Sequence, residues 1–232
     1  DIKLDEDRIE GYRNFCNKLW NASRFVFMNL EGYEGTCQLN EKAQRSIADQ
    51  WILSRLNATT QEVNQALENF KFNEAALTVY KFIWNEYCDW YIEFAKSRLV
   101  TDGPEKCAAQ NVLLHVLESA LKLLHPFMPF ITEEIWQKLP KEGDSIMVSP
   151  FPKFKEDGNN SKVEADMGKV MEVITGVRNI RGEMNLNPGL KLNALIKTRH
   201  ADLEAILKKH AHLICELARV DQITIGPDIE KT

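Results

Sequence analysis

A long stretch near the N-terminus, residues 8–30, carries apolar side chains at the spacing of an amphipathic helix. At about 100° per residue, these side chains fall on one broad arc of the helix. Its members are Tyr12, Phe15, Cys16, Leu19, Ala22, Ser23, Val26, Phe27 and Leu30. An apolar arc of this length must pack against other elements, so the sequence predicts that it lies in a core.

The opposite face of the same helix carries amides, cations and one aromatic ring. By helical spacing these side chains lie within about 120° of one another. They are Asn14, Asn17, Lys18, Asn21, Arg24 and Phe25. A solvated helix face usually mixes both signs of charge, but no acidic residue occurs between 11 and 30. A local excess of positive charge in a chain of net charge −5 indicates an anionic partner.

The chemistry of this polar face narrows the class of partner. Asn side chains both donate and accept hydrogen bonds, which suits base edges, and Lys and Arg suit phosphates. Aromatic stacking, amide hydrogen bonds and cationic contacts together are typical of proteins that read single-stranded RNA loops. The same pattern also fits an ordinary solvated helix face, and the pattern alone does not decide between the two.

The rest of residues 1–150 is also predicted to be helical. Apolar periodicity predicts helices over 41–70, 74–99, 104–125 and 132–139, with Asn73 as a cap and a brief extended segment at 145–148. The helix over 74–99 is dense in aromatic residues and is expected to be the most buried. Long helices with short connections pack antiparallel, so a helical bundle follows.

A stretch rich in Pro, Gly and Asn between 140 and 161 predicts a linker. Beyond it, helix and strand patterns alternate over 163–185, 191–197, 201–220 and 222–226, which indicates a small α+β unit. We therefore predict a mainly α fold, with an antiparallel helical bundle over 1–150 and a linker plus small α+β domain over 151–232. Arg178 and Arg181 are expected to be solvated or ion-paired, or to face RNA or an adjoining domain.

Composition excludes several classes of protein. The hydrophobic fraction of 44% and charged fraction of 27% are those of a soluble globular protein, and a pI of about 5.6 argues against a general polyanion binder. The five cysteines are scattered without CxxC spacing, so they indicate neither a disulfide framework nor a zinc site. A reducing cytosol is the expected compartment, with no membrane association. A first residue other than Met fits a piece of a longer protein.

Five blocks of the sequence resemble the anticodon-binding region of the valyl-tRNA synthetase family, which belongs to class I. Residues Tyr12–Phe25 are similar to the opening helix of that region. The other blocks follow in the family's order and are Trp51–Ser54, Trp84–Tyr91, His125–Trp136 and Ile180–Gly189. The block at 125–136 also occurs in the isoleucyl and leucyl relatives. The resemblance covers essentially the whole chain, and it implies a helical bundle of the class I synthetase anticodon-binding type.

The resemblance implies a function in tRNA anticodon recognition, as part of a valine–tRNA ligase that attaches valine to tRNA(Val) using ATP. Valine anticodons end in adenine–cytosine. By position in the family's motif, the anticodon-binding residues would be Lys18, Arg24 and Phe25, followed by Asn17 and Asn21. Phe25 would stack on an unstacked base, the two cations would contact phosphates or base acceptors, and the two amides would contact the edges of A or C.

The two nucleotide-binding signatures of class I catalytic domains do not occur in this sequence, nor does a Gly-rich phosphate loop. The coiled coil that bacterial valyl enzymes typically add is also absent from it. We therefore expect no catalytic residue, no metal and no cofactor here; ATP and magnesium would belong to the catalytic domain of the parent enzyme. The expected partners are the anticodon stem–loop of tRNA(Val) and that catalytic domain, with the protein a cytoplasmic monomer.

Two alternative interpretations stay open. The first is the corresponding domain of an isoleucyl or leucyl enzyme, against which the blocks Asn17–Asn21 and Arg181–Gly189 argue. The second is a helical interaction module with no role in RNA binding. Such a module would show no contribution from phosphates, and therefore no steep salt dependence of tRNA binding.

Overall fold

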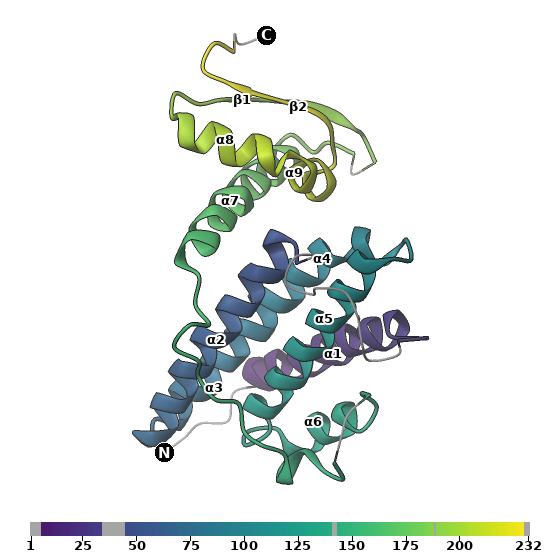
Figure 1. Ribbon diagram of the computed structural model, residues 1–232, viewed down its shortest axis with the longest axis vertical. Coiled ribbons are helices and arrows are strands. Elements are labelled where there is room, and N and C mark those ends of the chain that lie inside the picture. The colour runs from purple at the N-terminus through teal and green to yellow at the C-terminus, as the bar shows by residue number, and fades with distance from the viewer. Residues whose placement is uncertain (1–5, 34–44, 141–142, 188, 230–232) are drawn as a thin grey trace. The chain divides into compact units, whose positions relative to one another are not determined.

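The chain divides into two units, Asp1–Asn160 and Ser161–Thr232, and the first of them is built of helices. The computed structural model describes residues 6–33, 45–140, 143–187 and 189–229 (Figure 1). The first unit is a helical bundle and the second is a small α+β unit, so the predicted fold class is confirmed.

The helices of the first unit follow the predicted order. They are α1 (Glu6–Asn29), α2 (Ile47–Glu68), α3 (Phe72–Lys81), α4 (Ile92–Ala95), α5 (Pro104–Leu124) and α6 (Pro129–Trp136). A π-helix, Phe82–Tyr91, joins α3 to α4, and a 3-10 turn, Lys96–Leu99, follows α4. We call this continuous segment, residues 72–99, the aromatic helix. It packs against α1 and α2, and α5 packs against α2 and α6 (Figure 1).

The aromatic helix supplies several of the largest side chains of the core, although the largest fully buried one, Trp136, belongs to α6, and α5 buries a larger share of its residues than the aromatic helix, which was expected to be the most buried. Phe82, Tyr87, Tyr91 and Phe94 are almost wholly buried. Burial raises the pKa of both tyrosines well above the ordinary value, so their hydroxyl groups stay protonated and can donate. The Tyr87 hydroxyl donates to the carbonyl oxygen of Leu113 at 3.1 Å, which satisfies the hydroxyl inside the core.

Three local expectations were wrong. Tyr12, placed on the buried arc of α1, is 64% exposed, because residues 9–14 lie at an end of the helix that no part of the described chain covers. Asn73 is not a cap; α3 begins one residue earlier, and its cap residue, Lys71, makes no side-chain capping bond. Residues 146–148 form a 3-10 turn rather than an extended segment, and the hydroxyl of Ser145 accepts from the backbone N–H of Met147 at 3.2 Å.

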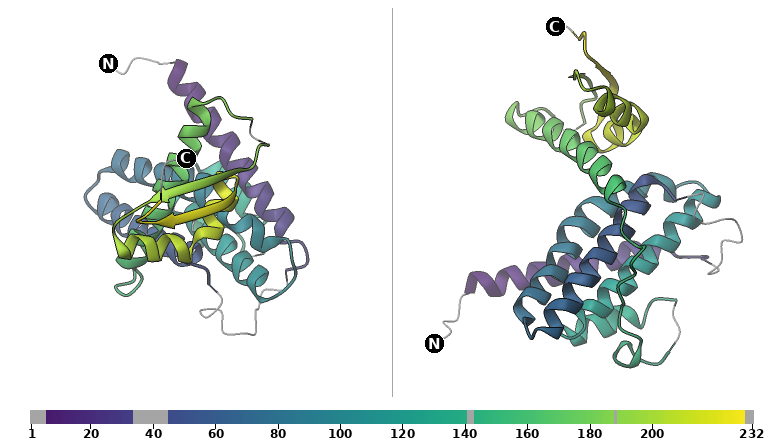
Figure 2. Two further views of the ribbon diagram at one scale, coloured as in Figure 1. Left: turned by 90° about the horizontal axis from the view of Figure 1, so that it is seen from above. Right: turned by 60° about the vertical axis from the view of Figure 1, so that its left-hand side comes forward.

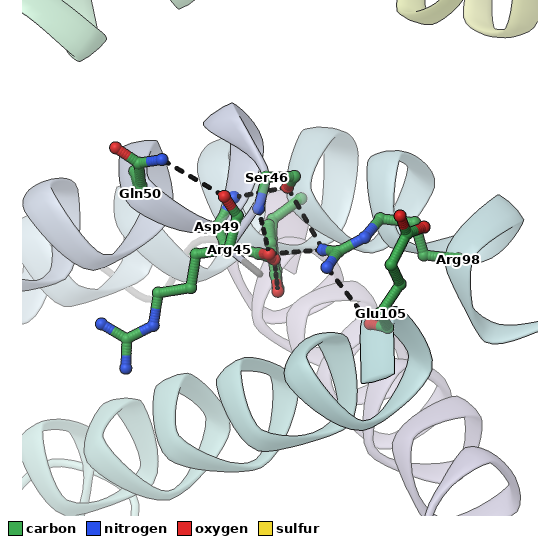
Figure 3. Close-up of polar contacts among 7 residues, drawn as sticks. Arg45, Ser46, Asp49, Gln50, Arg98 and Glu105 are labelled. Carbon is green, nitrogen blue, oxygen red and sulfur yellow. Dashed lines mark hydrogen bonds and ion pairs between the residues drawn. The ribbon is translucent and has the colours of Figure 1, made fainter. Parts of the chain in front are cut away.

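A buried carboxylate at the start of α2 ties three parts of the bundle together (Figure 3). Ser46 and Asp49 form a capping box, in which each side chain accepts from the other residue's backbone N–H, at 3.1 and 2.8 Å. The Tyr91 hydroxyl donates to Asp49 at 2.7 Å, and Arg98 forms an ion pair with the same carboxylate. Arg98 also donates to the backbone carbonyl of Glu105 at 3.1 Å. The start of α2, the end of the aromatic helix and the start of α5 therefore share one polar cluster.

The segment that precedes helix α7 (Ser161–Glu183) is hydrogen-bonded to α2. The Asn57 amide donates to the carbonyl of Lys155 at 2.8 Å and accepts from the N–H of the same residue at 2.9 Å. The N–H of Asn160 donates to the Ser54 hydroxyl at 2.7 Å, and a Cβ added to Gly158 would lie 2.6 Å from the Asn57 side chain. The stretch before Ser161, predicted as a linker, is therefore hydrogen-bonded to the helical unit.

The second unit contains α7 (Ser161–Glu183), β1 (Leu192–Lys197), α8 (Ala201–Lys209), α9 (Ala211–Ala218) and β2 (Val220–Gly226). The two strands pair in parallel, with an irregularity between Leu192 and Asn193 (Figure 2). The helix predicted over 201–220 is divided at His210, and α9 is capped by Arg219, whose backbone lies in the left-handed region. The helix α7 packs against α8 and α9 and buries Met167, Val170 and Ile174.

Arg178 and Arg181 both stabilise this second unit; Arg178 is exposed, as expected, whereas Arg181 is buried, contrary to the expectation of a surface position. Arg181 is only 8% exposed. Its guanidinium donates to the backbone carbonyls of Asn187, Leu190 and Arg219, at 3.1, 2.7 and 3.3 Å. Arg178 donates to the carbonyl of Leu217 at 3.0 Å, near the end of α9. The two side chains thus join α7 to the turn before β1 and to the end of α9.

Cys16, Cys88 and Cys215 are free thiols, whereas Cys107 is disulfide-bonded, a bond that the cysteine spacing did not indicate. Within the described ranges, no helix combines the length and the apolar character needed to cross a membrane.

We predict that Asp49→Ala lowers the free energy of unfolding of the chain by about 3–5 kcal/mol, because it leaves the Arg98 charge without its buried partner. Urea unfolding monitored by circular dichroism measures this change. Asp102→Ala is the control, since its carboxylate is 94% exposed and pairs only at the surface with Lys106. Equal stability of the two variants would contradict the importance of the buried cluster.

We predict that Arg181→Met increases the rate of amide hydrogen exchange in β1, because backbone carbonyls that Arg181 now satisfies would be left unpaired. The expected loss of about 2 kcal/mol in the free energy of local opening corresponds to more than a tenfold increase in exchange rate. Hydrogen-exchange mass spectrometry of peptides covering 192–197 measures it. Arg199→Met removes the same charge from an exposed position and should leave exchange unchanged.

Candidate nucleic-acid interface

The buried arc of α1 fixes which side of this helix faces outward. Phe15, Leu19 and Val26 are at most 2% exposed and hold α1 on the bundle. The amides of Asn17 and Asn21, on the other side of the helix, are exposed. The rotation of α1 therefore presents the predicted polar face, and it follows directly from the 3.6-residue spacing of the buried side chains.

This polar face forms one wall of an open pocket with a volume of about 450 Å³. The opposite wall comes from the aromatic helix. The lining residues are Asn14, Asn17, Lys18, Asn21, Ala22 and Phe25 from α1, and Cys88, Ile92 and Lys96 from the aromatic helix. Amides, two ammonium groups, an aromatic ring and a short apolar floor are therefore gathered in one place.

The Lys18 ammonium is held in position by two contacts. Its Nζ lies 2.5 Å from Asp89 Oδ1 and 3.8 Å from the centroid of the Trp84 ring. The Trp84 ring in turn stacks near Phe15, with 6.4 Å between the ring centroids. The Lys18 side chain remains 24% exposed and that of Asp89 remains 48% exposed. A fixed but accessible cation is suited to binding an anionic or hydrogen-bond-accepting ligand.

The Phe25 ring also lines the pocket and is half-buried. The Nζ of Lys96 is 6.0 Å from the centroid of this ring and 2.6 Å from the Glu93 carboxylate. An aromatic ring with a cation beside it provides a surface on which a base can stack close to a phosphate.

The structure brings four of the five predicted anticodon-binding residues into this pocket, namely Asn17, Lys18, Asn21 and Phe25. Arg24 is exposed and does not line the pocket. Helical spacing places it on the flank of the same face of α1. Contact with RNA stays a prediction for all five residues.

Sequence reasoning missed the second wall of the pocket. Cys88, Ile92 and Lys96 are spaced four residues apart, so a common helix face could have been inferred for them. We interpreted the aromatic helix as core, and its periodicity does not show which of its faces meets α1. Trp84 was interpreted as packing, and the structure adds its contact with the Lys18 ammonium.

The chemistry of the pocket fits binding rather than covalent reaction. Burial raises the pKa of the Cys88 thiol to about 12, an effect that outweighs the lowering by Lys18 and that Asp89 reinforces. The thiol is therefore protonated at neutral pH and is a poor nucleophile. In the parts of the chain that the structure describes, no three His, Cys, Asp or Glu side chains are grouped so that they could hold a metal ion.

We predict that iodoacetamide alkylates Cys88 at pH 8 at least about 100-fold more slowly in the folded chain than in the urea-unfolded chain, because little thiolate is present in the folded state. Mass spectrometry of the peptide that contains Cys88 measures both rates. Similar rates in the two states would contradict the raised pKa of this thiol.

Comparison with known proteins identifies relatives of the whole chain. The valine–tRNA ligase of Geobacter sulfurreducens is 49% identical over 100% of this chain and 26% of the relative. That of Syntrophotalea carbinolica is 46% identical over the same shares, and that of Thermotoga maritima is 48% identical over 85% of the chain and 22% of the relative. The chain thus spans about a quarter of the length of the curated relatives it matches.

A family profile described as the anticodon-binding domain of tRNA ligase matches residues 49–196. This match covers more than half of the chain, and together with the valine–tRNA ligase relatives it confirms the resemblance found in the sequence. The chain belongs to the family of anticodon-binding domains of tRNA ligases.

Proposed function

We propose that this chain recognises the anticodon of valine tRNA, as part of a valine–tRNA ligase that attaches valine to its tRNA using ATP. The observation that carries the proposal is the pocket between α1 and the aromatic helix, which combines amides, an aromatic ring and fixed cations. The family of the chain and the printed names of its relatives support the choice of an anticodon and of valine.

In this proposal an unstacked anticodon base enters the pocket. Phe25 stacks on the base, a contact worth about 1–3 kcal/mol. The amides of Asn17 and Asn21 form hydrogen bonds with base edges, because each amide can donate and accept. The short apolar floor formed by Ile92 excludes water from the stacked base.

The cations around the pocket bind the RNA backbone or base acceptors. Lys96 lies beside the Phe25 ring, and Arg24 lies on the flank of the same face. Such contacts add a salt-dependent contribution to affinity. Because the chain as a whole carries a net charge of −5, RNA would be attracted to this patch and not to the surface in general.

ATP, magnesium and valine would bind outside this chain, in the catalytic domain of the parent enzyme. The residues present do not fit a nucleotide and metal site: the sequence has no Gly-rich phosphate loop, and the described part of the structure has no group of metal-ligating side chains. The catalytic domain would be the second partner of the chain, in a cytoplasmic, monomeric enzyme.

The proposal predicts base-specific binding. The chain should bind tRNA(Val) at least about tenfold more tightly than the same tRNA with its middle anticodon base changed from A to U, because the wrong base leaves polar groups in the pocket unpaired. Fluorescence anisotropy at a fixed salt concentration measures both affinities. Equal binding of both RNAs would reduce the interaction to general phosphate attraction and contradict the proposal.

Two substitutions on α1 test the assigned roles. Phe25→Ala should lower affinity for tRNA(Val) about 5–100-fold through loss of stacking, whereas Phe25→Tyr, which keeps the ring, should bind normally. Arg24→Ala should weaken binding of all RNAs alike and reduce the slope of log K against log salt by about 0.7–0.9. Unchanged affinity in both alanine variants would show that this face of α1 is not the anticodon site.

A further inference from the structure

An acidic residue stands beside the cationic side of the pocket, where phosphate binding alone would not favour it. Asp89 Oδ1 lies 2.5 Å from the Lys18 ammonium, and Lys18 lines the pocket. The carboxylate repels phosphate groups and offsets the charge of the cation next to it. The pair therefore calls for an explanation other than phosphate binding alone.

The pair has a fixed orientation and unused hydrogen-bonding capacity. An ammonium group has three N–H donors; one of those of Lys18 reaches Asp89, and the Trp84 ring lies 3.8 Å away. An ionised carboxylate has two oxygens and about four acceptor sites, of which Lys18 occupies one. Since 48% of the Asp89 side chain is exposed, a ligand can reach the remaining acceptor sites.

For a base whose orientation is fixed by its ribose–phosphate chain, a donor and an acceptor held side by side in one order distinguish two classes of base, because the order of donor and acceptor differs between them. On their Watson–Crick edges, adenine and cytosine place an amino donor next to a ring nitrogen that accepts. Guanine and uracil place a carbonyl acceptor next to a ring N–H that donates. A carboxylate accepts from an amino group but repels a carbonyl oxygen, and an ammonium donates to a ring nitrogen but repels an N–H.

We propose that the Lys18–Asp89 pair is a specificity element that selects an amino base, adenine or cytosine, over a keto base, guanine or uracil, in the RNA bound at this pocket. The inference rests on the proposed function, which supplies the RNA. It names Asp89 as a further specificity-determining residue, in contact with the base through an acceptor that no cation of the pocket can provide.

The competing explanation is that Asp89 only masks the charge of Lys18. Charge masking and base reading predict different effects of Asp89→Asn on RNA binding. If the carboxylate only offsets the Lys18 charge, its neutralisation strengthens binding of every RNA by the same factor and steepens the salt dependence. If the carboxylate reads an amino group, its replacement by an amide removes discrimination, because an amide can present either its oxygen or its NH₂ group to the base.

The test uses the 232-residue chain and three anticodon stem–loop RNAs. One has the valine anticodon, one has its middle A changed to G, and one has its last C changed to U, so that each swap keeps the size of the base. Affinities are measured by fluorescence anisotropy for the unaltered chain, Asp89→Asn and Asp102→Asn. Asp102 also pairs with a lysine, but its partner, Lys106, does not line the pocket, whereas Lys18, the partner of Asp89, does; Asp102→Asn therefore controls for the change in net charge.

The unaltered chain and Asp102→Asn should prefer the amino base by about tenfold or more at one of the two positions, and Asp89→Asn should reduce this preference to about threefold or less. An unchanged preference in Asp89→Asn, with a uniform gain in affinity, would establish charge masking and overturn the inference while leaving the proposed function intact. The inference would also be overturned if the unaltered chain discriminates against the A→U tRNA of the earlier experiment but against neither of the two size-matched swaps. No sequence-dependent binding by the unaltered chain would overturn the proposed function together with this inference.

Discussion

The packing of Phe15 between α1 and the aromatic helix is the contact on which the candidate site depends. The Phe15 ring is 2% exposed and its centroid lies 4.8 Å from that of Tyr80 and 6.4 Å from that of Trp84. Trp84 presents its ring to the Lys18 ammonium, which is paired with Asp89. Hydrophobic burial thus sets the positions of the polar groups one layer further out, and the same packing brings the two walls of the pocket together.

Local periodicity accounts for much of what could be predicted. The helices, their order and the outward face of α1 follow from which side chains recur every three to four residues. That signal reports that a face is buried but not which element covers it, so the wall formed by Cys88, Ile92 and Lys96 could not be assigned to α1. The resemblance to a known family identified the function class, but it did not point to Asp89 or Lys96.

Arg181 illustrates the second limit of sequence reasoning. Beside the apolar stripe of α7 it has the spacing of a surface residue, yet it is buried because backbone carbonyls at Asn187, Leu190 and Arg219 converge on its guanidinium. Residues 151–160 have the composition of a linker, yet they are bonded to α2 through Asn57 and Ser54. In both cases the deciding partners are backbone groups, or side chains distant in sequence, that a pattern of residue types does not reveal.

The central claim is that RNA binds between α1 and the aromatic helix, and lysine acylation with and without an anticodon stem–loop tests it most directly. The account predicts that the RNA slows acylation of Lys18 and Lys96, which line the pocket, and leaves Lys71 and Lys208 unaffected. Mass spectrometry reads all four sites in one experiment. Protection of Lys71 or Lys208 without protection of Lys18 and Lys96 would place the RNA elsewhere and contradict the account.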